Sequence, residues 1–430
     1  MLQPFSNDSA PKKEGSWTRV EVTDKWLPEQ LAAVLAQEEG FVWLDSAIAA
    51  PGAVSILTCW PDTLLRGHQA TDWHLVEQSL QSGLATGQTG GLFGWVGYDG
   101  EFVLGSYPHA LLYDHDRAEW FDSGDFWQKT ARFRAKNAPF STQEPPQPLH
   151  FTPQVQRTDF LSQVQSAQEY IRAGDIYQVN LSHPWKAAWP SETAFFPLYQ
   201  RLRKVSPAPH AACLNLAGTT VLSASPELFL KIDGDTIATH PIKGTRPRFP
   251  ADPTRDEAAA RELLACEKER AELLMITDLE RNDLGQVCRF GSVQVPDLWR
   301  VESFAQVYHL VSTVTGHLLP GISHAQAFHA CFPGGSITGA PKKRASEIIQ
   351  ELETWPRGLY TGAIGYFGFD GHSQWNIAIR TAIRRGEEIT FHAGSGIVAD
   401  SVPEKEWEET LHKASGILAA FSGIELALKG

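Results

Sequence analysis

The sequence has little cysteine and no long apolar run. Its five cysteines are widely scattered and form no CxxC pair, which argues against a disulfide framework and against a zinc site. No apolar run approaches the roughly eighteen residues that a membrane-spanning helix needs, and the polar opening segment lacks the apolar stretch of a secretory signal. We therefore expect buried free thiols, no membrane partner and a cytoplasmic location.

Basic residues are scarce relative to acidic ones. The chain has 37 Lys and Arg against 50 Asp and Glu, which gives a formal net charge of −13. A field of this sign repels nucleic acid, so we expect no nucleic-acid partner. If the ligand is an anion, positive charge must be gathered locally, which draws interest to basic residues inside glycine-rich motifs.

The length of 430 residues predicts two or three structural units. Residues 136–156 hold four prolines before Pro153 and show little hydrophobic periodicity. This composition predicts a linker between an N-terminal subdomain, 1–135, and a larger unit, 157–430.

Hydrophobic patterns predict several elements of the larger unit. A helix is expected from Thr158 or Asp159 to Gly174, then a strand, and one long helix from about Thr254 to Leu284. Three strand candidates, 358–369, 374–385 and 387–399, have the spacing of an antiparallel meander. A last helix is expected after Ser401.

Two pairs of carboxylates lie at helical spacing. Glu269 and Glu272 fall within the apolar stripe of the long helix, which is costly unless something compensates. Glu406 and Glu409 share a face of the last helix with Lys413, for which an exposed, solvated face is the alternative. If both pairs converge, they could hold one hard cation, with Mg²⁺ the natural choice beside an anionic oxygen ligand.

Two glycine-rich segments favour anion binding. Residues 332–349 form a loop that feeds a helix, although Ala-Pro follows Gly339 where a Walker A motif needs Lys and then Ser or Thr. Residues 392–398 form a second such turn. Arg380 lies in an apolar strand candidate nearby, where carboxylate recognition and an ion pair are both open.

Lys243 lies between a Pro-Ile pair and a Gly-Thr pair in "THPIKGTRPR" (239–248). An amine attacks carbon only after losing its proton, which desolvation or nearby positive charge promotes. The apolar neighbours are compatible with a nucleophile. An ion pair with Glu227 or another acid explains these residues equally well.

Eight ordered motifs resemble those of the chorismate-utilising enzymes, strongly over residues 155–425 and more loosely before them. In chain order they are "SASPELFL" (223–230), "PIKGTRPR" (241–248), "DLERNDLG" (278–285), "ESFAQVYHLVS" (302–312), "FPGGSITGAPK" (332–342), "YTGAIGYFG" (360–368), "NIAIRTA" (376–382) and "AGSGIVADSVPEKEWEET" (393–410). The resemblance implies an α+β fold with two antiparallel β-sheets packed as a sandwich, helices outside, and N- and C-terminal parts interleaved.

The resemblance also implies roles for individual residues. Lys243 would attack C2 of chorismate, and Glu227 would protonate the departing C4 hydroxyl. The implied catalytic residues are Lys243, Glu227 and His309; the implied substrate-binding residues are Gln178, Gly244, Thr245, Ser336, Tyr360, Arg380, Gly394, Ser395, Gly396 and Lys413. Glu272 and Glu409 would hold Mg²⁺, with Glu269 and Glu406 in support.

Within the family, "PIKGT" is similar to the aminodeoxychorismate synthase component I branch, and anthranilate synthases usually show alanine at Lys243. Gln178 stands where isochorismate and salicylate synthases carry a water-activating lysine, which favours ammonia as the incoming nucleophile. No glutaminase motif surrounds any cysteine, so we expect ammonia from a separate glutamine amidotransferase subunit in a heterodimer.

Two rival functions are an anthranilate synthase component I and a catalytically silent subunit that binds an effector. The chain retains Glu227, Lys243 and the four glutamates, which argues against a subunit without catalytic activity. The segments 206–214 and 42–47 resemble the walls of the tryptophan site of relatives but depart from it, so tryptophan binding stays open.

Overall fold

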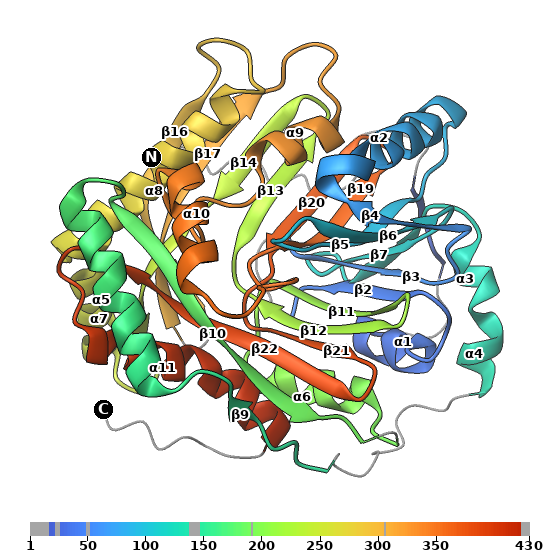
Figure 1. Cartoon of the computed structure of the whole chain (residues 1–430). Coiled ribbons are helices and arrows are strands. Elements are labelled where there is room, and N and C mark those ends of the chain that lie inside the picture. Colours follow the sequence, from blue (N-terminus) through green and yellow to red (C-terminus); the bar gives the residue numbers. More distant parts are fainter. Residues whose placement is uncertain are drawn as a thin grey trace.

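The computed structural model describes residues 17–21, 26–48, 52–136, 147–190, 192–304 and 307–422. These residues form two large antiparallel β-sheets, with helices around them (Figure 1). The predicted α+β class and the predicted pair of antiparallel sheets are confirmed.

The first sheet has twelve strands in the described residues. They are β1 (Thr18–Arg19), β2 (Phe41–Asp45), β3 (Val54–Thr58), β7 (Leu111–Asp114), β8 (Glu119–Asp122), β9 (Thr152–Pro153), β10 (Gln178–Ala188), β11 (His210–Leu216), β12 (Thr219–Ser225), β18 (Gly339–Ala340), β21 (Thr381–Arg385) and β22 (Glu388–Ile397). Their order is β1-β8-β7-β3-β2-β11-β12-β21-β22-β10-β18, and β9 pairs with β10.

The second sheet has ten strands in the same part of the chain. They are β4 (Thr63–His68), β5 (Gly91–Val96), β6 (Glu101–Tyr107), β13 (Leu228–Asp233), β14 (Thr236–His240), β15 (Ile242–Pro247), β16 (Gln294–Ser303), β17 (Val307–His317), β19 (Ala363–Gly368) and β20 (His372–Ile377). Their order is β15-β17-β14-β13-β20-β19-β5-β6-β4, and β16 pairs with β17.

Helices surround the two sheets (Figure 1). They are α1 (Pro28–Leu35), α2 (Gln69–Thr86), α3 (Phe126–Lys129), α4 (Ala131–Lys136), α5 (Arg157–Ala173), α6 (Phe195–Val205), α7 (Pro253–Ala265), α8 (Glu267–Gly285), α9 (His324–Cys331), α10 (Lys342–Leu352) and α11 (Pro403–Ser422). The predicted helix that stops at Gly174 is α5, whose cap has φ 83°, and the predicted last helix is α11.

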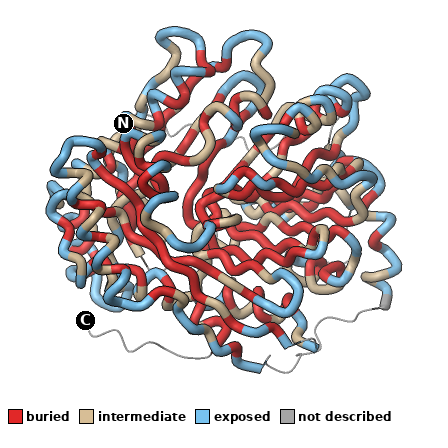
Figure 2. Tube along the Cα trace, in the orientation of Figure 1, coloured by how far each residue is buried: buried red, intermediate tan, exposed pale blue. Residues whose placement is uncertain are grey.

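Strands from before and after the predicted linker pair in both sheets. In the first sheet, β2 pairs with β11, and in the second, β5 pairs with β19. An apolar cluster joins the sheets through side chains such as Val42 and Leu214 on one side and Trp95 and Ile364 on the other. Figure 2 shows that buried residues follow the strands through the interior. Residues 137–146 of the linker lie outside the described residues.

The prediction of one helix over 254–284 is wrong. The chain forms α7 and α8 instead, because Cys266 adopts an extended conformation with φ −69° and ψ 106°. The apolar period continues across the break, and Leu263 and Leu273 pack into the same cluster. Neither glycine nor proline marks the break, so packing against the sheet decides it.

The prediction of one strand over 374–385, and hence of a simple meander, is also wrong. The segment splits into β20 in the second sheet and β21 in the first. Arg380 lies between them with φ 50°, in the left-handed region. Apolar and polar residues alternate both before and after Arg380, because each of the two strands has one buried face. The sequence pattern therefore gives no sign that the chain crosses between the sheets.

Candidate active site

The chain crosses between the sheets at two adjoining places. The crossing from β12 to β13 carries Glu227, and the crossing from β20 to β21 carries Arg380. Backbone hydrogen bonds join the crossings: Ile377 N donates to Glu227 O at 3.0 Å, and Ala224 N donates to Arg380 O at 3.0 Å. Two residues far apart in sequence, a carboxylic acid and a guanidinium, are thereby fixed in one seam.

Glu227 is a deeply buried acid, only 4% exposed. Its Oε1 and the Oγ of Ser336 have no hydrogen-bond partner within the described residues. Burial raises the pKa of Glu227, and the nearby Ser336 hydroxyl and Lys243 ammonium offset this only in part. A carboxyl group with a raised pKa keeps its proton closer to neutral pH, which suits a general acid.

Lys243 lies on β15, opposite Leu310 of β17. Charge interactions link its ammonium to Glu227, Glu272 and Glu409. In the described part of the chain, however, no hydrogen bond or ion pair holds it. The direct pairing with Glu227 that the sequence left open is therefore not formed, and the amine is free to meet a ligand.

Gln178 lies beside this amine. A Cβ atom placed on Gly396 would be 3.7 Å from Lys243 Nζ and 3.2 Å from Gln178 Nε2, so the amine, the amide and the glycine backbone meet. Gln178 is fully buried, and neither side-chain polar atom has a partner among the described residues. An unpaired buried amide costs about 1–3 kcal/mol, so this group needs a ligand or water.

His309 lies on β17, opposite Thr245 of β15. Its Nδ1 is 3.0 Å from Thr245 Oγ1 and 3.4 Å from Gly244 O. Burial lowers the pKa of His309 to about 4, with Arg380 adding to the effect, so the imidazole is neutral at pH 7. Gly244 has φ 70°, and a Cβ atom there would lie 2.9 Å from Glu269 Oε2, so only glycine fits.

The guanidinium of Arg380 has no ion pair or hydrogen bond to the residues that the structure describes. Burial lowers the pKa of Arg380, and Glu227 offsets this only in part. The ion-pair alternative is therefore not formed as a direct contact. A partly buried guanidinium without a direct partner is well suited to bind a carboxylate through two hydrogen bonds.

Tyr360, Gly394 and Lys413 meet in what we call the Tyr360–Lys413 corner. A Cβ atom on Gly394 would lie 2.8 Å from the Tyr360 hydroxyl. Lys413 Nζ donates to Gly394 O at 3.0 Å and pairs with Glu409 Oε1 at 2.7 Å. The Lys413 side chain is 45% exposed.

The four predicted glutamates come from α8 and α11. Burial raises the pKa of Glu272, with Glu269 and Glu409 adding to the effect and Lys243 opposing it. Burial also raises the pKa of Glu406, with Glu409 again adding to it. The interactions between the pairs indicate that they approach each other. Glu406 is 6% exposed, so the fully solvated face considered for α11 is wrong at this position.

The donor chemistry of Glu272 and Glu409 fits a divalent cation, because crowded carboxylates are stabilised by positive charge. In the described residues, no group of three or more His, Cys, Asp or Glu side chains is arranged to hold a metal ion. Mg²⁺ usually binds one or two carboxylates and completes its shell with water and substrate oxygen. The Mg²⁺ site therefore stays a proposal.

Ser395 lies on β22 between the two backbone positions predicted to contact substrate, Gly394 and Gly396. It is fully buried, and its hydroxyl has no hydrogen-bond partner in the described ranges. The strand pairing places Ser395 opposite Leu181 of β10. The glycine-rich turn predicted at 392–398 is therefore part of a regular strand, with glycine where other groups approach closely.

The sequence interpretation missed two buried ion pairs. Lys342 Nζ lies 2.7 Å from Asp283 Oδ2, and Arg357 contacts Glu353. Lys342 and Asp283 do lie inside quoted motifs, so charged residues in otherwise apolar motifs were a usable signal. The pairings could not be identified, because 58 residues lie between Asp283 and Lys342, and Glu353 and Arg357 lie outside the quoted motifs.

The segments 42–47 and 206–214, compared above with a tryptophan site, come together. β2 pairs with β11, with Asp45 opposite Ala211. A cavity beside them is lined by residues including Asp45, His210, Tyr366 and Asn376. Asp45 is engaged by Arg203 Nε at 2.7 Å.

Four of the five cysteines are buried, Cys266 is half-buried, and all five thiols are free, as predicted. Among the described residues, no helix is long and apolar enough to cross a membrane.

Comparison with known proteins identifies one family. Residues 66–419 match the family described as chorismate binding enzyme. An anthranilate synthase component 1 of Haloarcula marismortui is 47% identical over 293 residues, covering 67% of this chain and 59% of that protein. The aminodeoxychorismate synthase component 1 of Bacillus subtilis is 45% identical over 264 residues, covering 59% and 54%.

The chain therefore spans somewhat more than half the length of these two relatives. A solved structure also resembles it: anthranilate synthase component I of Streptococcus pneumoniae has a TM-score of 0.74 and 29% identity, covering 86% of this chain and 93% of that one.

Proposed function

The chain belongs to the chorismate binding enzyme family, and from this premise we propose that it is an aminodeoxychorismate synthase component I. In this role it converts chorismate and ammonia to 4-amino-4-deoxychorismate, a step towards para-aminobenzoate and folate. The observation that carries the proposal is Lys243, an amine without a direct partner in the described residues. It lies close to Gln178 and interacts electrostatically with Glu227.

The proposed chemistry is a substitution in two steps. Lys243 Nζ bonds to C2 of chorismate, the two conjugated ring double bonds shift, and the C4–O bond breaks while Glu227 protonates the departing oxygen to give water. Ammonia then bonds to C4, the two double bonds shift back, and the C2–N bond to Lys243 breaks. The Glu227 carboxylate takes the surplus proton. Covalent catalysis replaces one hard displacement with two easier ones.

The remaining site residues orient the substrate. Arg380 binds the carboxylate on the enolpyruvyl side, which the Tyr360–Lys413 corner and the Gly394 to Gly396 backbone enclose. Ser336, Thr245 and neutral His309 line the ring pocket. Arg380 lies at the seam between the sheets, Thr245 and His309 lie on strands, and Lys413 lies on α11. Cationic and hydrogen-bonding groups dominate this set, so it suits an anionic substrate.

Mg²⁺ is the proposed cofactor, held by Glu272 and Glu409 with Glu269 and Glu406 in support. When bound, it would engage the ring carboxylate of chorismate and neutralise the two glutamates that interact with Lys243.

Ammonia would come from a separate glutamine amidotransferase subunit in a cytoplasmic heterodimer. The relatives named component 1 support a partner. The test is whether the purified chain uses ammonium salt and gains use of glutamine only when such a subunit is added. Equal use of glutamine by the chain alone would contradict the proposal.

Anthranilate synthase component I is the second candidate, favoured by the 47% identity to the Haloarcula marismortui protein. That enzyme aromatises the ring and releases pyruvate. Lys243 favours the first candidate because anthranilate synthases usually show alanine there.

One experiment separates these functions. The chain is incubated with chorismate, Mg²⁺ and ammonium, and the product is identified by mass. We expect aminodeoxychorismate without fluorescent anthranilate. Rapid quenching and peptide mass analysis should then find a chorismate-derived mass on Lys243. Undiminished amination by Lys243→Ala under excess ammonium would exclude the covalent route.

A further inference from the structure

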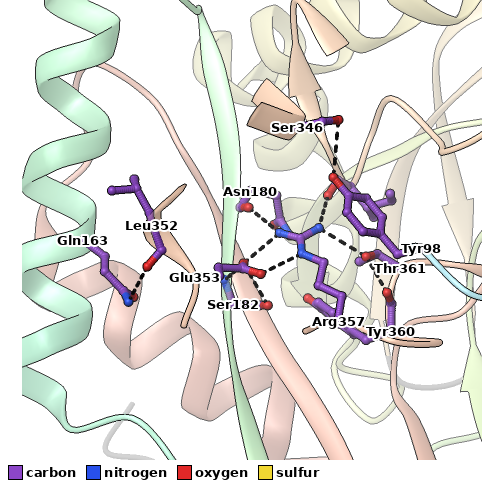
Figure 3. A network of polar contacts seen from close by, with 11 residues as sticks. Tyr98, Gln163, Asn180, Ser182, Ser346, Leu352, Glu353, Arg357, Tyr360 and Thr361 are labelled. Carbon is purple, nitrogen blue, oxygen red and sulfur yellow. Dashed lines mark hydrogen bonds and ion pairs between the residues drawn. The ribbon is translucent and has the colours of Figure 1, made fainter. Parts of the chain in front are cut away.

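Arg357 and Glu353 form a buried ion pair beside the candidate active site (Figure 3). Their side chains are 1% and 5% exposed. Arg357 Nε donates to Glu353 Oε2 at 2.9 Å, and Nη2 donates to Oε1 at 2.8 Å. The two parallel bonds fix the plane of the guanidinium as well as its position.

The remaining guanidinium bonds go to segments that carry proposed site residues. Nη2 donates to Asn180 O at 2.7 Å, two residues after Gln178. Nη1 donates to Ile337 O at 3.1 Å and to Thr361 Oγ1 at 3.2 Å. Ile337 follows Ser336, and Thr361 follows Tyr360, so one guanidinium joins three parts of the site.

Glu353 extends this connection to β10. Its Oε1 accepts hydrogen bonds from Ser182 N at 2.7 Å and from Ser182 Oγ at 3.0 Å. Ser182 lies opposite Gly394 in the sheet. The ion pair therefore also fixes the strand that supports the Tyr360–Lys413 corner.

Thr361 needs this support because its φ is 59°, a conformation that is strained for a β-branched residue. Its hydroxyl donates to Tyr360 O at 2.6 Å and accepts from Arg357. Its backbone N donates to Ala378 O at 2.9 Å. The strained turn directs the preceding side chain, Tyr360, so that its hydroxyl reaches Gly394.

We propose that Arg357 and Glu353 are positioning residues that hold the Tyr360 hydroxyl, directly through Thr361 and indirectly through β10, in place for binding of the carboxylate side of the substrate. The inference rests on the proposed function, because it takes Tyr360 as a substrate contact. A purely stabilising role explains the contacts less well, since a buried ion pair often adds little stability over apolar residues of the same size.

The test uses the full chain with ammonium, Mg²⁺ and varied chorismate. Arg357→Lys keeps the charge but cannot make the same set of directed bonds. We expect its KM for chorismate to rise about tenfold, as for the loss of one good hydrogen bond to substrate, with a smaller change in kcat. In a Tyr360→Phe background, Arg357→Lys should change KM less than about twofold, because the lost contact is then already absent.

Thr361→Gly is a second variant that tests the same effect on KM if Arg357→Lys folds poorly. Glycine adopts a positive φ without strain, so stability in urea should not fall, yet KM should rise because the hydroxyl link to Arg357 is gone. Arg203→Lys is the matched control: Arg203 forms a partly buried pair with Asp45 elsewhere, and we expect a lower urea midpoint with unchanged KM.

The outcomes separate the two proposals. If wild-type chain consumes no chorismate, the proposed function fails. If wild type is active and both Arg357→Lys and Thr361→Gly keep the wild-type KM, the positioning role is refuted. It is also refuted if Arg357→Lys raises KM equally with and without the Tyr360 hydroxyl.

Discussion

Replacing Arg380 should stabilise the protein while impairing it as an enzyme. Arg380 lies at the crossing from β20 to β21 with φ 50°, and within the described residues its guanidinium has no direct partner. Because burial lowers the pKa of Arg380 more than Glu227 raises it, folding disfavours the charged form. Arg380→Gly removes both the charge and the unfavourable side chain at a positive φ.

The two effects have opposite signs. A non-glycine residue in the left-handed region costs about 1–2 kcal/mol, and an unpaired charge costs more on burial, although Arg380 is only partly buried. We expect Arg380→Gly to gain about 1–3 kcal/mol in free energy of unfolding. Loss of two charge-assisted hydrogen bonds to a carboxylate should lower kcat/KM by about 100- to 1,000-fold.

The free energy of unfolding is measured by urea titration at pH 7, and kcat/KM with chorismate and ammonium. Arg380→Lys is the matched control, since it keeps the charge and the positive φ but loses the planar fork. It should impair kcat/KM without the gain in stability. A loss of more than about 1 kcal/mol in Arg380→Gly would refute the reasoning, because it would make Arg380 a structural residue.

Three further predictions concern acids. Because Glu227 has a raised pKa and acts as a proton donor, kcat/KM should fall as pH rises through that pKa. Glu227→Gln should abolish this pH dependence. The same pH profile in both proteins would contradict the role of Glu227 as proton donor. Glu272→Gln and Glu409→Gln should each raise the Mg²⁺ concentration for half-maximal activity at least about tenfold, and unchanged Mg²⁺ titrations would exclude them as ligands. Hydrogen bonds from Arg248 lower the pKa of Asp256 to about 2, below its unfolded value of about 3.9. Its stabilisation is thus present above pH ~3.9 and lost as pH falls through about 2, so Asp256→Asn should lower the urea midpoint at pH 7 much more than at pH 2.

The parts of the fold that the sequence predicted correctly depend on local signals. Helix α5 combines an apolar stripe with Gly174 at its end, and α11 begins at Pro403. The break at Cys266 and the crossing at Arg380 were missed, because neither residue type usually marks such a change. In both places the spacing of apolar residues stays regular although the chain changes direction, and only tertiary packing imposes that change.

The candidate site was predicted mainly by resemblance. Its residues lie on β10, β15, β17, β22, α8 and α11, at the two crossings, and in the turns that carry Ser336 and Tyr360. Spacing could pair Glu269 with Glu272 on one helix, but not Glu272 with Glu409 on another. The Arg357 network was missed because two of its acceptors, Ile337 O and Asn180 O, are backbone carbonyls, which leave no mark on residue type.

By itself the sequence determined the types of group available: an amine at Lys243, an acid at Glu227, four helical glutamates and glycines where backbone must approach closely. Tertiary structure alone decided that Lys243 has no direct partner in the described residues and that Arg380 and Glu227 share one seam. The physical reason is that residue type and period encode local conformation and burial, whereas contacts across sheets depend on where the chain crosses between them.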